Sequence, residues 1–311
     1  MRLRQVGRRW VSAVGLGAMP LSIEGRPDEA RAMATVRAAV DAGVTLIDTA
    51  DSYHWHAGEA GHNEQLVAKA LTGVTGVLVA TKGGRGRPGD GSWTVNGRPD
   101  HLIRACEASL RRLGTDRIGL YQLHKPDPAV PWVDSVGALR TLLDAGKVEA
   151  VGLSNVTCAQ VEEAREILGA DLVSVQNRFS PAAREHAPVL ALCTRLGLAF
   201  LPWSPLGGLS RSSLDGHSPL DEAHPRFAAV AGARGVSPQR VGLAWLLALS
   251  PVVVPIPGAS RPESIRDSAA AADLTLDVSE LEFLSYGRDT PVGGSDEGGA
   301  EPRLASCGRP R

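Results

Sequence analysis

The stretch from Leu46 to Tyr53 combines a short apolar segment with side chains that could transfer a proton. Leu46 and Ile47 are typical of a buried β-strand, and Asp48 follows them directly. A carboxylate at the end of an apolar strand is costly to bury unless a cation pairs with it. Tyr53 follows after a short polar turn, so an Asp and a Tyr should meet at one strand end, which indicates acid–base chemistry. A strand that ends in an Asp-capped turn beside a surface tyrosine would have the same sequence.

Polar or aromatic residues also stand at the ends of the other predicted strands. These residues are Lys82, His124, Ser154, Asn155, Gln176, Trp203 and Ser204. A free tyrosine has a pKa of about 10, and a nearby lysine ammonium would lower it. Asp48 would supply the counter-charge that a buried Lys82 needs, and His124 could donate a hydrogen bond to a substrate oxygen. This set suits protonation of an oxygen that gains negative charge, as when hydride adds to a carbonyl.

The composition excludes several classes of protein. Hydrophobic residues make up 43% and charged residues 22% of the 311 residues, as in ordinary globular proteins. The net charge of −1 gives no reason to expect a nucleic acid or an anionic membrane as partner. The longest apolar run, Val241 to Leu249, is too short to span a bilayer. The four cysteines are scattered without a Cys-x-x-Cys motif, which favours free thiols in a cytoplasmic protein.

Short apolar segments alternate with amphipathic segments about eight times along the chain, which predicts strands that alternate with helices. The predicted strands are 13–16, 46–48, 77–81, 118–123, 148–153, 172–175, 199–202 and 252–255. The predicted helices are 27–42, 63–71, 99–113, 131–145, 158–168, 181–196, 223–233, 238–249, 262–271 and 278–286. Strands that are apolar on both faces and separated by helices form parallel sheets. Eight of them favour a single (β/α)8 TIM barrel, an α/β fold, over a doubly wound sheet.

The two ends of the chain are expected to lie outside this repeat. Residues 1–14 read as a short β-hairpin, and the Gly-rich polar residues 289–311 as a flexible C-terminal tail. No shift in composition divides residues 1–288, so we expect one barrel domain. The helix that runs to Leu71 is expected to be capped by Asn63. In such barrels the active site lies at the C-terminal ends of the strands, which is where the candidate residues converge.

A series of short motifs resembles the aldo-keto reductases, over about residues 4–286. The motifs are Leu46–Tyr53 with Asn63 and Glu64 downstream, Ala80–Lys82, Tyr121–His124, Gly152–Asn155, Gln176 and Asn177, and Trp203–Leu206. The chain is similar to bacterial NADP(H)-dependent oxidoreductases of this family and is related to its channel β-subunit-like members. The resemblance implies a (β/α)8 barrel that reduces a small-molecule carbonyl substrate with NADPH, without a Rossmann domain or a metal.

The resemblance also implies roles for individual residues. Tyr53 would be the general acid, and Lys82 with Asp48 would tune it. His124 would orient the carbonyl. The implied cofactor-binding residues are Gly17, Ser154, Asn155, Gln176, Trp203, Ser204, Leu206, Gly208, Gly258 and Arg261. In that set, residues 154, 155 and 176 would hold the nicotinamide carboxamide, Trp203 would stack on the ring, and residues 204–208 would cover the pyrophosphate.

The adenosine end of the implied cofactor site departs from the family pattern. Many members have a Lys-Ser pair where this chain has Gly258 and Ala259, and a Glu-Asn pair where it has Asp267 and Ser268. Arg261 is therefore the best remaining candidate for a contact with a 2′-phosphate. NADH stays possible as an alternative to NADPH.

Two local patterns allow a second interpretation. His54 and His56, with Glu59 and His62 nearby, could suggest a metal site. No helix or hairpin is evident to fix their spacing, so we expect no metal and place these residues along the pocket or on the surface. The segment 85–87, Arg-Gly-Arg, resembles an RGG-type nucleic-acid segment, but without further repeats we expect a plain loop.

The identity of the substrate stays open. Trp55 and Trp93 are expected to line the substrate pocket, with Trp132 as a further candidate. An aldehyde, a pyridoxal-like ring and a keto-sugar are all compatible with such a pocket. Two other functions also stay open: a redox-sensing regulatory subunit that binds NADP(H) with little turnover, and an unrelated (β/α)8 lyase or isomerase. The chain could be a monomer or a small homo-oligomer.

Overall fold

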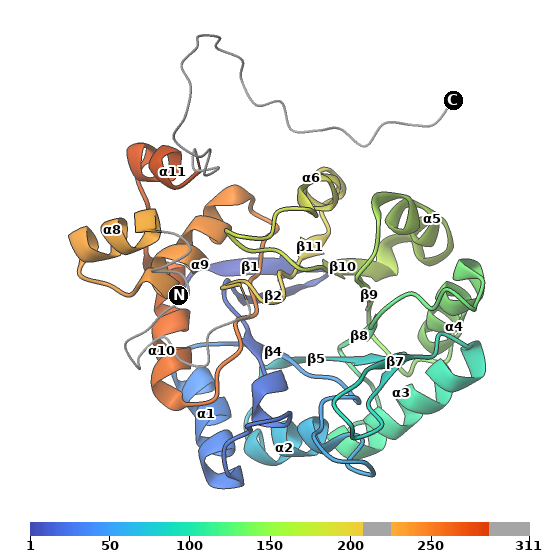
Figure 1. The fold of residues 1–311 in the computed structure, drawn as a ribbon. Helices are drawn as coiled ribbons and strands as arrows, with labels where there is room; N and C mark the ends of the chain where they lie inside the picture. Colours follow the sequence, from blue (N-terminus) through green and yellow to red (C-terminus); the bar gives the residue numbers. More distant parts are fainter. Residues whose placement is uncertain (208–224, 286–311) are drawn as a thin grey trace, which may run out of the picture.

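The structure, a computed structural model, describes residues 1–207 and 225–285. Its centre is a curled parallel sheet of seven strands with helices around its outer side (Figure 1). In spatial order the strands are β11 (Ala199–Phe200), β10 (Leu172–Gln176), β9 (Val151–Ser154), β8 (Leu120–Leu123), β5 (Leu78–Gly83), β4 (Leu46–Asp48) and β3 (Leu16–Gly17). Strands that follow one another in this order are linked by helices, so the sheet fits an α/β barrel.

The extended segment 252–258 lies where the eighth strand was expected. The Val254 amide donates to the Phe200 carbonyl on the β11 side at 2.9 Å, and the Gly17 amide on the β3 side donates to the Pro257 carbonyl at 2.9 Å. The segment therefore hydrogen-bonds to both edges of the sheet, but it is not a regular strand. Pro255 and Pro257 have no amide N–H to donate, which explains the irregular pairing.

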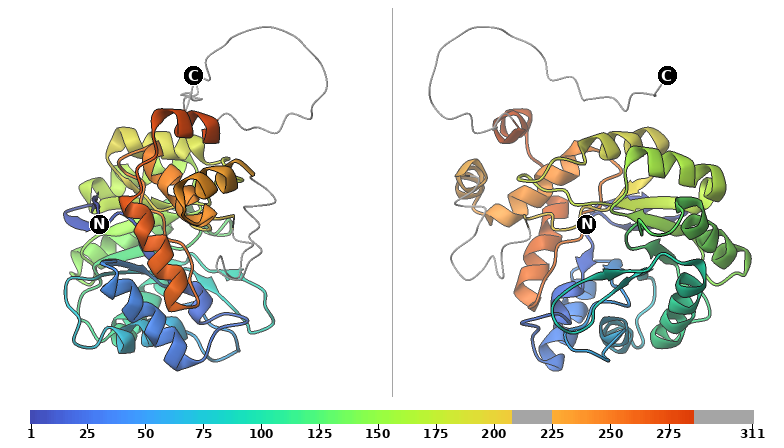
Figure 2. Two further views of the ribbon diagram at one scale, coloured as in Figure 1. Left: turned by 90° about the vertical axis from the view of Figure 1, so that its left-hand side faces the viewer. Right: turned by 45° about the vertical axis from the view of Figure 1, so that its right-hand side comes forward.

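The helices form a ring around the sheet, which Figure 2 shows from two further directions. They are α1 (Glu29–Asp41), α2 (His62–Ala70), α3 (Pro99–Leu113), α4 (Trp132–Asp144), α5 (Cys158–Leu168), α6 (Ala187–Leu196), α8 (Pro225–Arg234), α9 (Pro238–Leu249), α10 (Pro262–Ala270) and α11 (Val278–Ser285). α10 packs beside α1 and so closes the ring, while α8 and α11 pack on α9 and on each other at its outside. The helix predicted over 181–196 begins only at Ala187, because Ser180 and Ala183 hydrogen-bond to each other in a turn.

The start of α2 differs from the prediction. Asn63 does not cap this helix, which begins one residue earlier after Gly61, a glycine with a φ of 83°. The Asn63 side chain is instead fully buried: it accepts a hydrogen bond from the Thr49 hydroxyl at 2.6 Å and donates to the Ala18 carbonyl at 2.8 Å. Asn63 therefore ties the turn after β4 to the turn after β3.

An antiparallel hairpin formed by β1 (Leu3–Val6) and β2 (Arg9–Ser12) lies at the N-terminal ends of the barrel strands. Its buried residues Val6 and Val11 pack in one cluster with Leu46 and Leu78, the first residues of β4 and β5. Because the hairpin covers this end of the sheet, the opposite end, where the strands finish, is the one left open for a site.

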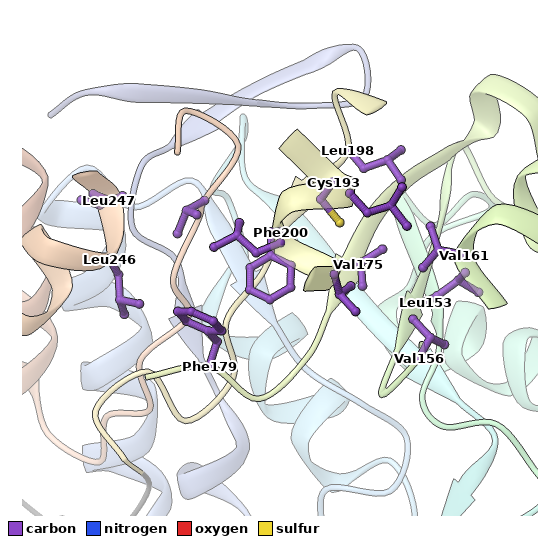
Figure 3. Packing of buried hydrophobic residues seen from close by; sticks show 14 of the residues in the cluster. Leu153, Val156, Val161, Val175, Phe179, Cys193, Leu198, Phe200, Leu246 and Leu247 are labelled. Atoms are coloured by element: carbon purple, nitrogen blue, oxygen red, sulfur yellow. The ribbon is translucent and has the colours of Figure 1, made fainter. Parts of the chain in front are cut away.

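A larger core fills the space between the sheet and the helices (Figure 3). Phe179 and Phe200 meet edge to face with ring centroids 5.8 Å apart, and Trp245 is buried, as expected from its apolar helix. Cys106 and Cys193 are free and buried. Cys158 is disulfide-bonded, so the expectation of free thiols is wrong at that residue.

Two further expectations concern the C-terminal tail of the chain and the absence of a membrane-spanning helix. The proposed tail, residues 289–311, lies outside the described residues, as does the cysteine within it, Cys307. In residues 1–207 and 225–285, no helix combines the length and the apolar character needed to cross a membrane.

Candidate active site

A buried lysine at the end of β5 joins the two residues with which the sequence analysis began. The Lys82 ammonium donates to Asp48 Oδ2 at 2.6 Å, to the Thr49 carbonyl at 2.9 Å and to the Tyr53 hydroxyl at 3.0 Å. These three contacts match the three protons of the ammonium. Lys82 is completely buried, so its charge depends on these partners rather than on water.

Asp48 is held from its other side by two glutamines. Gln176 Nε2 donates to Asp48 Oδ1 at 2.8 Å, and Gln122 Nε2 lies 3.3 Å from the same oxygen. Both carboxylate oxygens therefore have hydrogen-bond donors, which is the condition under which a buried ion pair is tolerated. Gln122, which the sequence analysis did not single out as functional, comes from the interior face of β8.

His124 lies beside Tyr53 at the end of β8. The two rings meet edge to face with centroids 5.6 Å apart. The Ser52 hydroxyl lies 3.4 Å from His124 Nδ1, so Nε2 is the nitrogen left to face a ligand. The Asn155 side chain donates to the His124 carbonyl at 2.9 Å, which links this residue to the end of β9.

The charge states of these groups follow from burial and from each other. Burial raises the pKa of Tyr53, and Lys82 opposes this rise only in part. Burial works to lower the pKa of Lys82, but Asp48 and Tyr53 outweigh it, so that pKa is raised. Burial and then the charges of Lys82 and Arg85 hold the pKa of His124 well below its usual value. The site therefore presents a protonated phenol, an ammonium and a neutral imidazole.

This result corrects one expectation. Lys82 was expected to bring the pKa of Tyr53 below that of a free tyrosine, but the cost of burying a phenolate is larger than the attraction of the ammonium. Lys82 therefore offsets part of the burial effect and does not reverse it.

A cavity of about 400 Å³ opens at this end of the sheet. Its lining includes Asp48, Tyr53, His124, Trp93 and Arg85 on the side of β4, β5 and β8. On the side of β9, β10, β11 and segment 252–258 it includes Ser154, Asn155, Gln176, Trp203, Ser204, Pro205, Leu206, Ile256, Pro257, Gly258, Ala259, Ser260, Ser264 and Ser268, and near β3 Gly17, Met19 and Pro20. One wall thus carries titratable side chains, and the other carries neutral polar groups and backbone.

The neutral wall has an unusual backbone. Asn155 and Ser204 adopt φ angles of 60° and 46°, which side chains other than glycine rarely tolerate. The Trp203 indole donates to Asn155 Oδ1 at 3.2 Å and fixes both groups at the cavity edge. A Cβ on Gly17 would lie 2.7 Å from the Ile256 carbonyl, so only glycine fits where β3 meets segment 252–258.

Most residues predicted for the cofactor line this cavity. Gly208 lies outside the described residues. Arg261 is not part of the lining: it is the residue before α10, and its Nε donates to the Ser264 hydroxyl at 3.0 Å.

The two predicted pocket tryptophans lie in different places. Trp93 lines the cavity, with its ring centroid 6.4 Å from that of Tyr53. Trp55 does not line it and instead stacks on His56, with ring centroids 4.9 Å apart. Trp132 packs on the outer core and donates to the Gln160 carbonyl.

The histidine-rich stretch after Tyr53 is occupied by other contacts. His54 Nδ1 lies 2.9 Å from the His56 carbonyl, and His62 Nδ1 lies 2.8 Å from the Ser22 hydroxyl. Glu59 pairs with Arg26, and the pKa of this carboxyl is lowered to about 2, mainly by that contact. Across the described ranges, no group of three His, Cys, Asp or Glu side chains is arranged to hold a metal ion.

Sequence reasoning missed Arg85 as a site residue. The segment 85–87 was expected to be a plain loop, but β6 (Arg85–Gly86) pairs with β7 (Thr94–Val95) in an antiparallel ribbon. The ribbon brings Arg85 and Trp93 to the cavity together. The signal that could have revealed it is an Arg and a Trp in one loop directly after Lys82.

Comparisons with known proteins agree with one another. A sequence profile described as the Aldo/keto reductase family matches residues 13–285. The chain is 34% identical to pyridoxine 4-dehydrogenase of Escherichia coli over 290 residues, which cover 90% of this chain and 96% of that protein. It is 35% identical over 278 residues to an uncharacterized oxidoreductase of Schizosaccharomyces pombe, covering 88% of this chain and 85% of the other.

The fold comparison adds a solved structure with its ligands. An aldo/keto reductase from Klebsiella pneumoniae, in complex with NADP and acetate, superposes with a TM-score of 0.74. The two chains are 27% identical, and the match covers 91% of this chain and 93% of the other.

Proposed function

The chain belongs to the aldo/keto reductase family, whose profile spans residues 13–285, and we propose that it reduces an aldehyde or ketone to an alcohol with NADPH. Relatives named as oxidoreductases and a structural neighbour in complex with NADP support this reaction class. The proposed roles of Tyr53 as acid and Lys82 as its partner rest on the 3.0 Å contact between the Lys82 ammonium and the Tyr53 hydroxyl at the cavity.

The neutral wall fits a dinucleotide. Trp203 offers an aromatic face, while Ser154, Asn155 and Gln176 offer the hydroxyl and amides that a carboxamide needs. Gly17 and its neighbour segment 252–258 leave no room for a side chain, so backbone can approach a ligand closely there. When bound, NADPH supplies the hydride that reaches the carbonyl carbon.

Tyr53 donates its proton to the carbonyl oxygen in this proposal. The charge that then develops on the Tyr53 oxygen lies 3.0 Å from the Lys82 ammonium. At that distance the attraction is roughly 5 kcal/mol for an effective dielectric constant of 20. Asp48 keeps Lys82 charged before and after the transfer, so the ammonium stabilises the phenolate without losing its own proton.

His124 orients the substrate. Because its pKa is held well below the usual value, the imidazole is neutral and can donate from Nε2 when Ser52 occupies Nδ1. A hydrogen bond from Nε2 to the carbonyl oxygen would keep that oxygen beside the Tyr53 hydroxyl. Two donors at one oxygen form the arrangement that stabilises a developing oxyanion.

The end of the cavity at α10 is proposed to hold the adenosine part. Ser260, Ser264 and Ser268 line it, and Arg261 is bonded to Ser264 next to them. Hydroxyl donors near an arginine suit a phosphate, so the arrangement is compatible with NADPH. A comparison of kcat/KM for NADPH and NADH measures how far this end discriminates between them.

Replacement of Tyr53 by phenylalanine tests the proposal directly. We expect kcat for NADPH oxidation, measured over a panel of aldehydes and keto-sugars, to fall by about 100-fold or more. NADPH binding, measured by the change in nucleotide fluorescence, should stay within about twofold, because the ring remains and only the acid is lost. Turnover near that of the wild type would remove Tyr53 as the acid. Binding of NADPH without turnover of any carbonyl by the wild type would instead favour a redox-sensing regulatory subunit.

A further inference from the structure

Arg85 stands on the cavity wall next to the proposed acid. It belongs to the β6–β7 ribbon that follows β5, and its guanidinium carbon lies 4.4 Å from the centroid of the Trp93 ring. The same ring is 6.4 Å from the Tyr53 ring and 6.3 Å from the His124 ring. Arg85 therefore shares one wall with the residues that would contact the carbonyl.

The cations near Arg85 are all paired. Lys82 is paired with Asp48, and Arg87 forms an ion pair with Glu24 and donates to the His54 carbonyl at 2.7 Å. These contacts neutralise the charges and fix Arg87 in place. Asp48, the acidic residue among those that line the cavity, is thus already paired with Lys82, and Glu24 is paired with Arg87.

Arg85 itself has no such partner in the described part of the chain. No acidic side chain of residues 1–207 and 225–285 forms an ion pair with it, and its Nε is buried without a hydrogen bond. A half-buried guanidinium whose carbon lies over the Trp93 ring can still donate hydrogen bonds to a ligand from its N–H groups. Because Asp48 and Lys82 compensate each other, Arg85 leaves the wall with an excess positive charge.

The position of Arg85 separates it from the proposed cofactor groups. Ser154 and Trp203 line the cavity at the end of β9 and beyond β11, whereas Arg85 follows the end of β5. An anion that met Arg85 would therefore be carried by the substrate rather than by the nucleotide.

We infer that Arg85 binds an anionic group of the carbonyl substrate, and that carboxylate-bearing aldehydes or ketones are the substrate class of this site. The inference rests on the proposed carbonyl reduction. The two oxygens of a carboxylate can accept two parallel hydrogen bonds from the planar edge of a guanidinium. A spherical anion cannot accept both bonds in this geometry. The contact would leave the carbonyl end of the substrate at Tyr53 and His124.

The test compares two aldehydes of similar size that differ in charge, 4-carboxybenzaldehyde and methyl 4-formylbenzoate. We expect the wild type to prefer the carboxylate at least tenfold in kcat/KM. Arg85→Gln should lower kcat/KM for 4-carboxybenzaldehyde by about 10- to 100-fold, mainly through KM, and change the ester by less than about threefold. Arg85→Lys should restore only part of the preference, because an ammonium cannot form the paired contact.

Arg98→Gln is the matched control. Arg98 is an exposed arginine after the same ribbon, and it does not line the cavity, so its loss removes the same charge without removing the contact. Equal losses for both aldehydes in Arg85→Gln would overturn the inference, because they would assign Arg85 to holding Trp93. Absence of a charge preference in the wild type would also overturn it.

Two further measurements separate the remaining outcomes. The first compares kcat/KM for glyceraldehyde 3-phosphate and glyceraldehyde, to show whether a phosphate can replace the carboxylate. A preference for the phosphate that Arg85→Gln abolishes would support anion binding by Arg85 but would change the substrate class to phosphorylated carbonyls. Calorimetry of 4-carboxybenzaldehyde binding to the NADP⁺-loaded protein gives a readout apart from turnover. Binding that depends on Arg85 without NADPH oxidation by any carbonyl would leave the anion site standing and reject the proposed function.

Discussion

Two buried clusters of charged residues lie on opposite faces of β5. The inner cluster consists of Asp48, Tyr53 and Lys82, and the outer cluster of Asp51, Glu64, Thr81 and Arg112. Thr81 and Lys82 are neighbours in the strand, so their side chains point to opposite faces of the sheet. The two clusters therefore offer a comparison of similar groups in two environments.

The outer cluster resembles the inner one in its bonding. Glu64 is fully buried and accepts from the Thr81 hydroxyl at 2.5 Å and from Arg112 Nε at 2.5 Å. Arg112 also donates to the Ser109 hydroxyl at 3.2 Å. As in the inner cluster, a buried carboxylate has a cation and a further donor.

The difference is access to the cavity. Tyr53 and Asp48 of the inner cluster line the cavity, whereas the outer cluster lies between the sheet and the helices α2 and α3 and contributes no lining residue. An ammonium beside an accessible hydroxyl can stabilise a charge that appears during a reaction, but an enclosed ion pair only joins secondary structure elements. Burial of charges is therefore no evidence of catalysis unless the groups also face a cavity.

Replacement of Lys82 by methionine should have the largest effect and should act on both stability and activity. The change leaves the Asp48 carboxylate buried without its cation, which costs about 3 kcal/mol or more of unfolding free energy. It also removes the stabilisation of the Tyr53 phenolate, so kcat should fall by roughly 100- to 10,000-fold. Denaturant unfolding and steady-state assays measure the two effects. Lys125→Met, a change at an exposed lysine, is the control; a kcat within threefold of wild type in Lys82→Met would contradict the role of the inner cluster.

Replacement of Arg112 by methionine should separate the two clusters. Glu64 would lose its cation in a buried position, so we expect a loss of about 3 kcal/mol in unfolding free energy. The kcat of the folded protein should stay within about threefold, because no group of the outer cluster faces the cavity. Arg111→Met removes a neighbouring exposed arginine and should change neither quantity. A loss of kcat without a loss of stability would show that the outer cluster takes part in the reaction.

Replacement of Asp51 by asparagine should have the smallest effect on activity, and its effect on stability should depend on pH. Burial and then Glu64 raise the pKa of the Asp51 carboxyl to about 8. Because the folded pKa lies above the unfolded value, the contribution of Asp51 to stability is present at low pH and is lost as pH rises from about 4 to about 8. The introduced amide cannot ionise, so the melting temperature of Asp51→Asn should match the wild type at about pH 4 and increasingly exceed it up to pH 9. A difference of the same size at both pH values would show that Asp51 does not titrate in this range.

The strand ends were predictable from local sequence. The apolar run 46–48, the run that ends at Lys82 and the run that ends at His124 each finish with a candidate site residue, and the parallel order of the strands brings these ends to one side of the sheet. The eighth strand was predicted in place but not in form, because two prolines remove the amides that a regular ladder needs.

The loops were much less predictable. Trp55 and Trp93 were equivalent candidates in the sequence, yet only Trp93 reaches the cavity, because the β6–β7 ribbon turns it inward. Arg85 was taken for a residue of a plain loop for the same reason. Asparagine is a common helix-capping residue, but the buried hydrogen bond from the Thr49 hydroxyl fixes the position of the Asn63 side chain instead.

The sequence by itself determined which side chains stand at the ends of the strands, since alternation and strand order follow from neighbouring residues. Only the tertiary structure decided which loop residues join them and what charge each group carries. The pKa of Tyr53 shows the reason: its direction depends on the balance between burial and the distance to Lys82, and both are properties of packed chain segments rather than of sequence.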